Sequence, residues 1–279
     1  RAVDDPGRVA LNAAGPRPGC VHWVLLGVIV LAAGVLRFAN LDGRPAGFFR
    51  DEAEKAYNSW ALATTGGMVD LPAPAPGRAR VQWRALPWMT NVFGTRTSTI
   101  YHYVSVPFMW TFGPTPAAAR MAAALVGTLT VGAIGLLLML AWGAGAGLAG
   151  AAWLALMPWH LVFSRWALQG IFVPLLMLGA LAGCYGIERR RAWGLPVLGA
   201  SLGWLFYAYS GAQPLVPAWG VCLAVVYRRR LFTAETLRSP AFWGACVLFL
   251  LPVVPTVLVR LEPGGSERMG RVAIWNDPE

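Results

Sequence analysis

Seven stretches of mainly apolar residues alternate with polar segments along the chain. They run over Cys20–Phe38, Ala117–Trp142, Gly145–Phe163, Trp166–Ile187, Trp193–Tyr209, Ala212–Tyr227 and Ala241–Val259. A helix of about 20 apolar residues crosses the hydrocarbon core of a bilayer. Lipid offers no partner for an unpaired backbone group, so each stretch is expected to be helical. The pattern predicts an all-α polytopic membrane protein with about seven transmembrane helices.

The composition supports this prediction and narrows the class of partner. Of the 279 residues, 57% are hydrophobic and 13% are charged, whereas soluble domains carry about 25% charged residues. A soluble globule and a disordered chain are therefore excluded. The net charge of +10 comes from basic residues that are all arginine except Lys55. We interpret this as a compositional bias, and expect membrane lipids and no nucleic acid as partners.

Arginines in the short loops predict the orientation. Arg189–Arg191 follow the fourth stretch and Arg228–Arg230 follow the sixth, whereas Arg165 stands alone after the third. Positive loops favour the cytoplasm. We therefore expect a flexible cytoplasmic tail (1–19), a transmembrane domain (20–259) and an outward tail (260–279) at which the chain is truncated.

The long loop 39–116 is then outward, and it holds two further helical segments. The first covers Glu52–Thr65. The second, Ile100–Phe112, is apolar but too short to cross a bilayer, which favours a helix lying in the membrane interface. Pro72–Gly77 is rich in proline and is expected to be a connector between the two.

An acidic pair, Asp51 and Glu52, opens the first of these helices. Acidic residues stabilise a helix start, so the pair can be a cap. Alternatively, a partly desolvated carboxylate near lipid has a raised pKa and can act as a general base. The pair could also bind a divalent metal, but no second cluster of ligands accompanies it, so the cofactor stays unknown.

Three other residues could carry chemistry on the same side. His102 could shuttle a proton or bind a substrate hydroxyl, or it could be an ordinary interfacial residue. Arg165 could reach lipid headgroups or hold an anionic group such as a lipid phosphate. Arg271 could be a second phosphate ligand or a solvated residue of the tail.

Four motifs in order resemble one family of membrane enzymes. They are Gly-Phe-Phe-Arg-Asp-Glu-Ala at 47–53, Phe-Gly-Pro-Thr-Pro-Ala-Ala-Ala-Arg at 112–120, Pro-Trp-His with Phe-Ser-Arg at 158–165, and Gly203 through Pro217. The chain resembles the GT-C glycosyltransferases over about Phe38–Trp275, in particular bacterial members of glycosyltransferase family 39, akin to protein O-mannosyltransferases and lipid A aminoarabinose transferases. It departs from them in having about seven spans where the family has eleven or more, and in having Gln213 where many members have arginine.

The resemblance implies transfer of a sugar from a polyprenyl-phosphate donor to a protein, lipid or glycan acceptor, with inversion, outside the cell (inner) membrane. It implies that Asp51 is the general base and that Glu52 orients it or contacts the acceptor. It also implies that Arg165 and Arg271 stabilise the leaving phosphate, and that Tyr101 and His102 line the acceptor side.

Two other classes remain open at this stage. A transporter or lipid flippase would show broken helices, charged residues at the membrane midplane and a weak internal repeat. Here no repeat is evident and the polar residues gather at the outer ends of spans. A purely structural scaffold is the remaining possibility.

Overall fold

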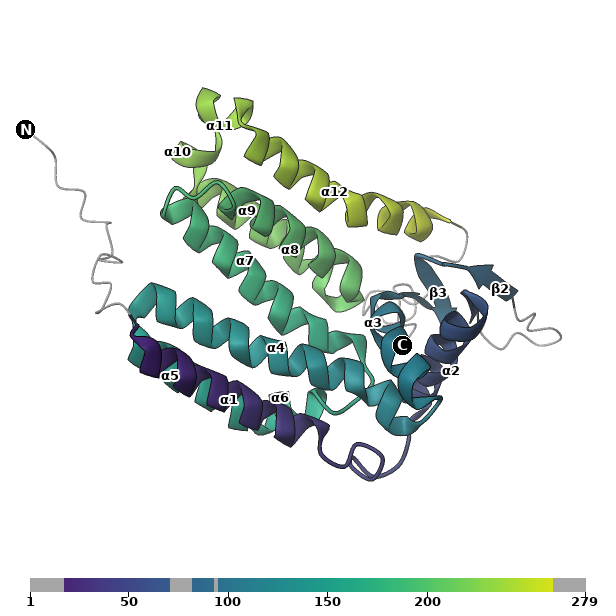
Figure 1. The fold of residues 1–279 in the computed structure, drawn as a ribbon. Helices are drawn as coiled ribbons and strands as arrows, with labels where there is room; N and C mark the ends of the chain where they lie inside the picture. The colour runs from purple at the N-terminus through teal and green to yellow at the C-terminus, as the bar shows by residue number, and fades with distance from the viewer. Residues whose placement is uncertain (1–17, 71–81, 93–94, 263–279) are drawn as a thin grey trace, which may run out of the picture.

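Helices dominate the structure, as the apolar stretches predict. The computed structural model describes residues 18–70, 82–92 and 95–262, and helices make up 76% of it (Figure 1). Four helices in this part are long and apolar enough to cross a membrane: α1 Cys20–Phe38, α4 Pro116–Trp142, α7 Phe172–Glu188 with the short helix η1 (Gln169–Ile171) before it, and α12 Pro240–Leu261. The helical membrane-protein class is therefore confirmed.

The other predicted spans form shorter helices. α8 covers Gly194–Ala208, and α9 covers Leu215–Val226 after a short 3-10 turn, η2, at Ser210–Ala212. A helix of 15 residues, such as α8, is about 22 Å long, less than the roughly 30 Å of a hydrocarbon core. The seven-span count thus stays a prediction.

The third predicted span is not one continuous helix, which corrects the sequence expectation. Residues 145–163 form α5 (Ala144–Leu156) and α6 (Pro158–Phe163), with Met157 between them at φ −59° and ψ 116°. Proline disfavours a helical conformation in the residue before it and has no N–H to donate. Pro158 therefore ends α5 and begins α6.

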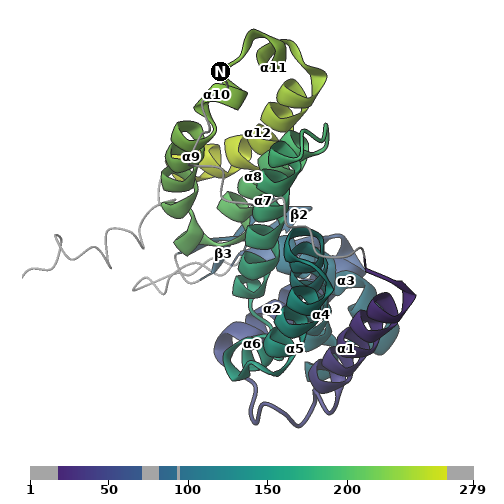
Figure 2. The ribbon, with the colours of Figure 1, turned by 90° about the vertical axis from the view of Figure 1, so that its left-hand side faces the viewer.

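The long helices pack in sequence across the bundle. α1 packs on α4 and α5, α4 on α7, α7 on α8, and α8 on α12. α1 and α12 lie at opposite edges in two perpendicular views (Figures 1 and 2). Glycines allow the closest contacts: a Cβ on Gly183 would lie 2.7 Å from the backbone nitrogen of Leu198.

The two helices predicted in the outer loop are present, at one end of the bundle. They are α2 (Arg50–Thr65) and α3 (Ile100–Phe112), which pack on each other and on α4. The short helices α10 (Arg228–Leu231) and α11 (Ala234–Arg238) lie at the other end (Figure 1). There Arg230 contacts the carboxylate of Glu188 at 2.8 Å. The arginine-rich loops after α7 and α9 thus share the end opposite α2 and α3.

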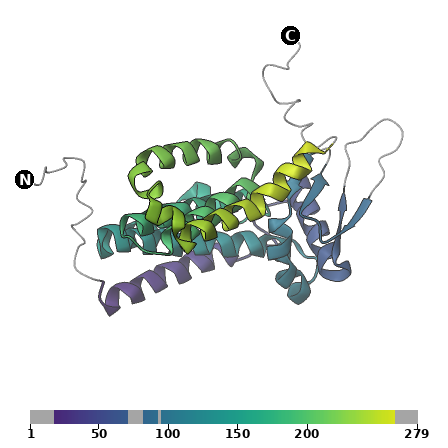
Figure 3. The ribbon, with the colours of Figure 1, turned by 90° about the horizontal axis from the view of Figure 1, so that it is seen from above.

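The described part of the loop 39–116 also contains four short strands that the sequence pattern did not predict. β1 (Gly67–Asp70) pairs antiparallel with β2 (Gln82–Ala85), with Gly67 opposite Ala85, and β3 (Met89–Val92) pairs antiparallel with β4 (Thr95–Ser98), with Met89 opposite Ser98. Strands of four residues are too short to show a clear alternation of polar and apolar positions. Figure 3 shows the strands from above, at the end away from the start of α1. The predicted connector Pro72–Gly77 lies outside the described residues.

Candidate functional site

The two residues of the acidic pair have different environments. The Glu52 residue is 2% exposed, whereas the Asp51 side chain is 48% exposed, with Arg50 Nε at 3.8 Å. Glu52 receives two hydrogen bonds from Arg120, Nε to Oε1 at 2.8 Å and Nη2 to Oε2 at 2.8 Å. The N–H of Ala167 also donates to Glu52 Oε1, at 3.1 Å. Glu52 is thus fully engaged, and Asp51 is the accessible carboxylate.

Arg120 connects three parts of the chain around this pair. α4 begins with Thr115 as its cap, whose side chain accepts the N–H of Ala118, and Pro116 as its first residue, which is a common helix start. Arg120 follows one turn later and is fully buried. Besides binding Glu52, it donates to the carbonyl oxygens of the Gly/Pro turn before α2, namely those of Leu41 at 2.7 Å, Pro45 at 3.1 Å and Gly47 at 2.7 Å.

The capping interpretation of the acidic pair applies to Glu52. Its Oε2 accepts the backbone N–H of Phe49 at 3.4 Å, the reciprocal contact of a capping box. Asp51 makes no comparable bond to the helix start among the described residues. The Asp51 side chain is therefore accessible, and its predicted role as a general base stays a prediction.

Arg165 closes the end of α1. From Nη1 and Nη2 it donates to five backbone carbonyl oxygens at 2.6–3.3 Å, those of Leu36, Arg37, Ala39, Asn40 and Arg44. The last carbonyls of a helix lack partners within the helix. The Arg165 guanidinium provides hydrogen-bond donors for those at the end of α1. Burial, and then the charges of Arg120 and Arg44, lower the pKa of Arg165 below its usual value. Arg165 therefore positions the turn, and its predicted phosphate contact stays a prediction.

The structure brings three of the four sequence motifs together. The turn that carries Arg165 reaches the start of α2 through the bond from Ala167 to Glu52. Arg120 joins the same carboxylate from α4. The start of α2, Arg120 of α4 and the Arg165 turn therefore meet at Glu52, although long segments separate these three parts in the sequence. Arg271 lies outside the described residues.

Tyr101 and His102 are fully buried in the described structure. The Tyr101 hydroxyl donates to the carbonyl of Ala119 at 2.6 Å, and its ring meets Phe172 edge-on. Both side chains are buried, so they anchor α3 against the neighbouring elements. Their predicted contact with an acceptor stays a prediction.

His102 belongs to a buried polar cluster that sequence reasoning missed. Glu54 binds Lys55 Nζ at 2.6 Å, Asn58 Nδ2 at 2.8 Å and His102 Nε2 at 3.2 Å. Asn58 also accepts the N–H of Val69, which attaches β1 to α2. The signal in the sequence was Lys55, the chain's one lysine, next to a carboxylate in the predicted helix Glu52–Thr65.

The charges in this cluster set its protonation. Burial acts to raise the pKa of Glu54, but the charge of Lys55 and the contact with His102 outweigh it and hold the pKa below its ordinary value. Burial and then Lys55 lower the pKa of His102, against the opposing effect of Glu54. Lys55 is thus the cation of the cluster, and His102 is neutral at neutral pH.

A second buried arginine, Arg37, was also missed, although an arginine inside a predicted span is a signal of function or of a specific contact. Arg37 donates to the carbonyls of Leu154 at 3.2 Å and Ala155 at 3.2 Å, where α5 ends. It also contacts Ser164 Oγ at 3.3 Å and His160 Nδ1 at 2.9 Å. Arg37 thereby supplies hydrogen-bond donors to the backbone carbonyls at the break between α5 and α6.

Among the described residues, no group of three or more His, Cys, Asp or Glu side chains is placed to hold a metal ion. Comparison with protein-family models and with curated protein sequences finds no match to this chain. The interpretation of the site therefore depends on its own residues.

Proposed function

We propose that this chain is a multi-pass membrane glycosyltransferase that moves a sugar from a polyprenyl-phosphate donor to an acceptor hydroxyl on the extracytoplasmic face. The observation that carries the proposal is the meeting at Glu52 of the α2 start, Arg120 of α4 and the turn that contains Arg165. The proposal is supported because Glu52, which contacts this turn, is the neighbour in sequence of an accessible carboxylate, Asp51. Arginine-rich loops favour the cytoplasm, and they lie at the opposite end (Figure 1), which would put the end with Asp51 outside.

In the proposed reaction Asp51 accepts the proton of the acceptor hydroxyl as general base. The acceptor oxygen forms a bond to the anomeric carbon while the bond from that carbon to the phosphate oxygen breaks. The configuration inverts, and the polyprenyl phosphate leaves with the electron pair. Arg165, and Arg271 from the tail, would stabilise the phosphate through charge-assisted hydrogen bonds.

Glu52 acts in this proposal as a positioning residue. Its carboxylate is engaged by Arg120 and by Ala167, so it is poorly placed to accept a further proton. By holding the first turn of α2, it would hold Asp51 in place. This supports one of the two roles that the sequence left open for Glu52.

The transporter alternative is favoured by one observation, the break between α5 and α6. In transporters, the carbonyl oxygens of unwound backbone of this kind coordinate the coupling ion. Here the carbonyls of Leu154 and Ala155 at the end of α5 are bound by Arg37 of the same chain. Because Arg37 already binds these carbonyls, they are not free to coordinate a transported ion, which weakens the support that the break gives to transport.

The test uses membranes that contain the full-length protein and a panel of polyprenyl-phosphate sugars. Mass spectrometry follows the release of free polyprenyl phosphate. We expect release from one donor, and a loss of about 10²–10⁴-fold in Asp51→Asn, the usual contribution of a general base. Glu235→Gln is the matched control, because this exposed carboxylate lies on α11 at the opposite end.

Equal release by wild type and Asp51→Asn would remove Asp51 as the base. Absence of release from every donor, with the protein correctly inserted, would favour the transporter.

A further inference from the structure

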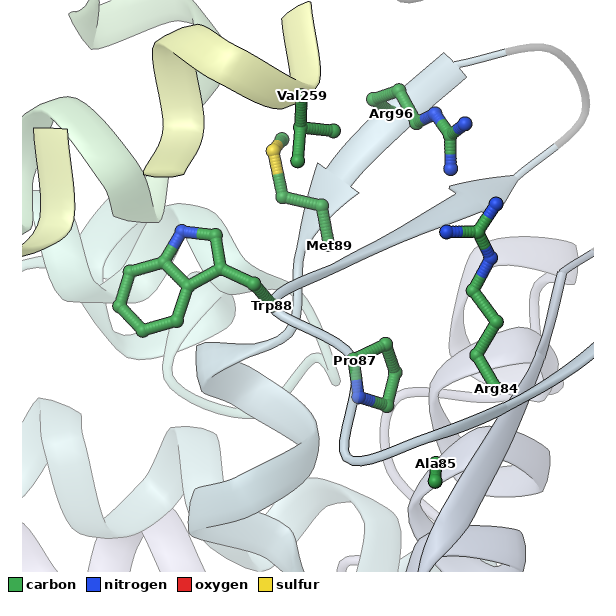
Figure 4. A pocket seen from close by; sticks show the side chains of 7 residues that line it. All are labelled: Arg84, Ala85, Pro87, Trp88, Met89, Arg96 and Val259. Atoms are coloured by element: carbon green, nitrogen blue, oxygen red, sulfur yellow. The ribbon is translucent and has the colours of Figure 1, made fainter. Parts of the chain in front are cut away.

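A pocket of about 340 Å³ lies between the two hairpins and the C-terminal end of α12 (Figure 4). Arg84 of β2 and Arg96 of β4 line one side of it, and Trp88, Met89 and Val259 line the other. None of these residues belongs to the cluster around Glu52. The pocket is therefore a separate candidate site.

Arg96 is the unusual residue of this pocket. Its side chain is only 9% exposed, yet its Nε and Nη1 atoms have no hydrogen-bond partner in the described part of the chain. Nη1 lies 3.6 Å from Asp70 Oδ2, beyond hydrogen-bond range, and Nη2 contacts Glu262 at 3.2 Å. Buried donors without acceptors cost free energy, so these N–H groups call for an acceptor from a ligand.

Arg84 brings a second guanidinium to the same space, as Figure 4 shows. Its Nε lies 2.7 Å from Asp70 Oδ2, and its side chain is 43% exposed. Asp70 is thus shared by two arginines, and its other oxygen accepts the N–H of Asn91 at 2.8 Å. The second carboxylate, Glu262, is half exposed, so it neutralises the buried positive charge only weakly.

Trp88, in the apolar wall of the pocket, is fixed by contacts with two helices. Trp88 donates from Nε1 to Thr256 Oγ1 at 3.1 Å, and its ring lies 4.4 Å from that of Tyr207. Trp88 therefore bridges the hairpins to α12 and α8. The wall faces the two arginines across the pocket, which suits a ligand with an anionic and an apolar part.

We propose that this pocket binds a phosphate group through Arg96 and Arg84. A phosphate has several acceptor oxygens and pairs with guanidinium groups through charge-assisted bonds. The group can come from a lipid headgroup, whose chains would follow the apolar wall, or from free phosphate. The proposal does not depend on the glycosyltransferase proposal, since the pocket and the Asp51 site share no residue.

The test measures binding by the full chain in phosphatidylcholine nanodiscs. One arm titrates inorganic phosphate by calorimetry. The other replaces a fifth of the lipid with phosphatidic acid and counts retained phosphatidic acid by native mass spectrometry. We expect binding in at least one arm, weakened tenfold or more by Arg96→Gln and by Arg84→Gln.

Two variants guard against misfolding and non-specific attraction. Arg84 is half exposed, so Arg84→Gln is expected to keep the fold even if Arg96→Gln does not, with circular dichroism as the check. Arg229→Gln, an exposed arginine of α10 at the other end, is the matched control and should leave binding unchanged.

Binding of inorganic phosphate that is lost in the pocket variants would support a site for free phosphate. Binding of phosphatidic acid alone, lost in the same variants, would support a lipid-headgroup site. Absence of binding in both arms, or binding that the folded Arg84→Gln variant retains in full, would overturn the proposal.

Discussion

Glu52 and Arg120, 68 residues apart, form a buried ion pair joined by two hydrogen bonds of 2.8 Å. The pair fixes the first turn of α2 against α4. It thereby separates the roles of two adjacent acidic residues: Glu52 holds the structure and Asp51 faces solvent. An isolated charge in this environment would be costly, so both partners are needed.

Glu52→Gln should destabilise the protein by about 3–5 kcal/mol, the usual cost of leaving one member of a buried pair uncompensated. Arg120 would keep its charge but lose its counterion. Denaturant unfolding in detergent, followed by circular dichroism, measures the change. The exposed-site control Glu235→Gln should stay within about 0.5 kcal/mol of wild type. A loss below 1 kcal/mol for Glu52→Gln would contradict the structural role given to the pair.

Arg165→Lys separates a positioning role from a purely electrostatic one. Lysine keeps the charge, but its ammonium group has only three donors and cannot bind all five carbonyl oxygens as the planar guanidinium does. We expect a loss of about 1–3 kcal/mol, because carbonyls at the end of α1 lose their donors. The midpoint of thermal unfolding in detergent reports the change. An unchanged midpoint together with lost sugar transfer would instead assign Arg165 to the phosphate alone.

Gly203→Ala should destabilise the contact between α8 and α12. A Cβ at this position would lie 2.8 Å from Cα of Phe249, so the helices must move apart, at a cost of about 1–3 kcal/mol. Gly220→Ala on α9 is the matched control, since a Cβ there meets nothing within 4 Å. It should be neutral or stabilising, because alanine favours a helix. Equal effects of the two variants in thermal unfolding would disprove the close approach.

Stability should fall as the pH drops below about 6.5, the pKa of an unfolded histidine. The pKa of His102 is lowered in the fold, so below pH 6.5 the unfolded state takes up a proton that the folded state does not. The free energy of unfolding therefore declines by at most about 1.4 kcal/mol per pH unit from this group. The lowered pKa of Glu54 adds a further loss only below about pH 4.5.

His102→Gln removes the titrating group while keeping a side chain able to donate to Glu54. Unfolding measured between pH 7.5 and 5 should therefore have a shallower slope in this variant than in wild type. Identical slopes would show that folding does not change the pKa of His102, which would contradict the lowered pKa.

The two helices of the loop 39–116 show how much of the secondary structure local sequence pattern predicts. The predicted Ile100–Phe112 coincides with α3, and the predicted Glu52–Thr65 begins two residues inside α2. In contrast, the break at Pro158 was missed, because the apolar residues on both sides of it continue without interruption. The strands were missed because four residues are too few to show alternation, and because contacts that hold them, such as that of Asn58 with Val69, join distant residues.

The sequence by itself determined the helical membrane class, the positions of the long helices and the presence of an acidic pair at a helix start. These follow from hydrophobicity and helix periodicity, which are local properties of the chain. Tertiary structure alone decided that Glu52 pairs with Arg120, that Arg165 closes the end of α1, and that Arg84 and Arg96 share a pocket. Such contacts join distant segments, and the free energy of burying a charge depends on the partner that packing brings to it.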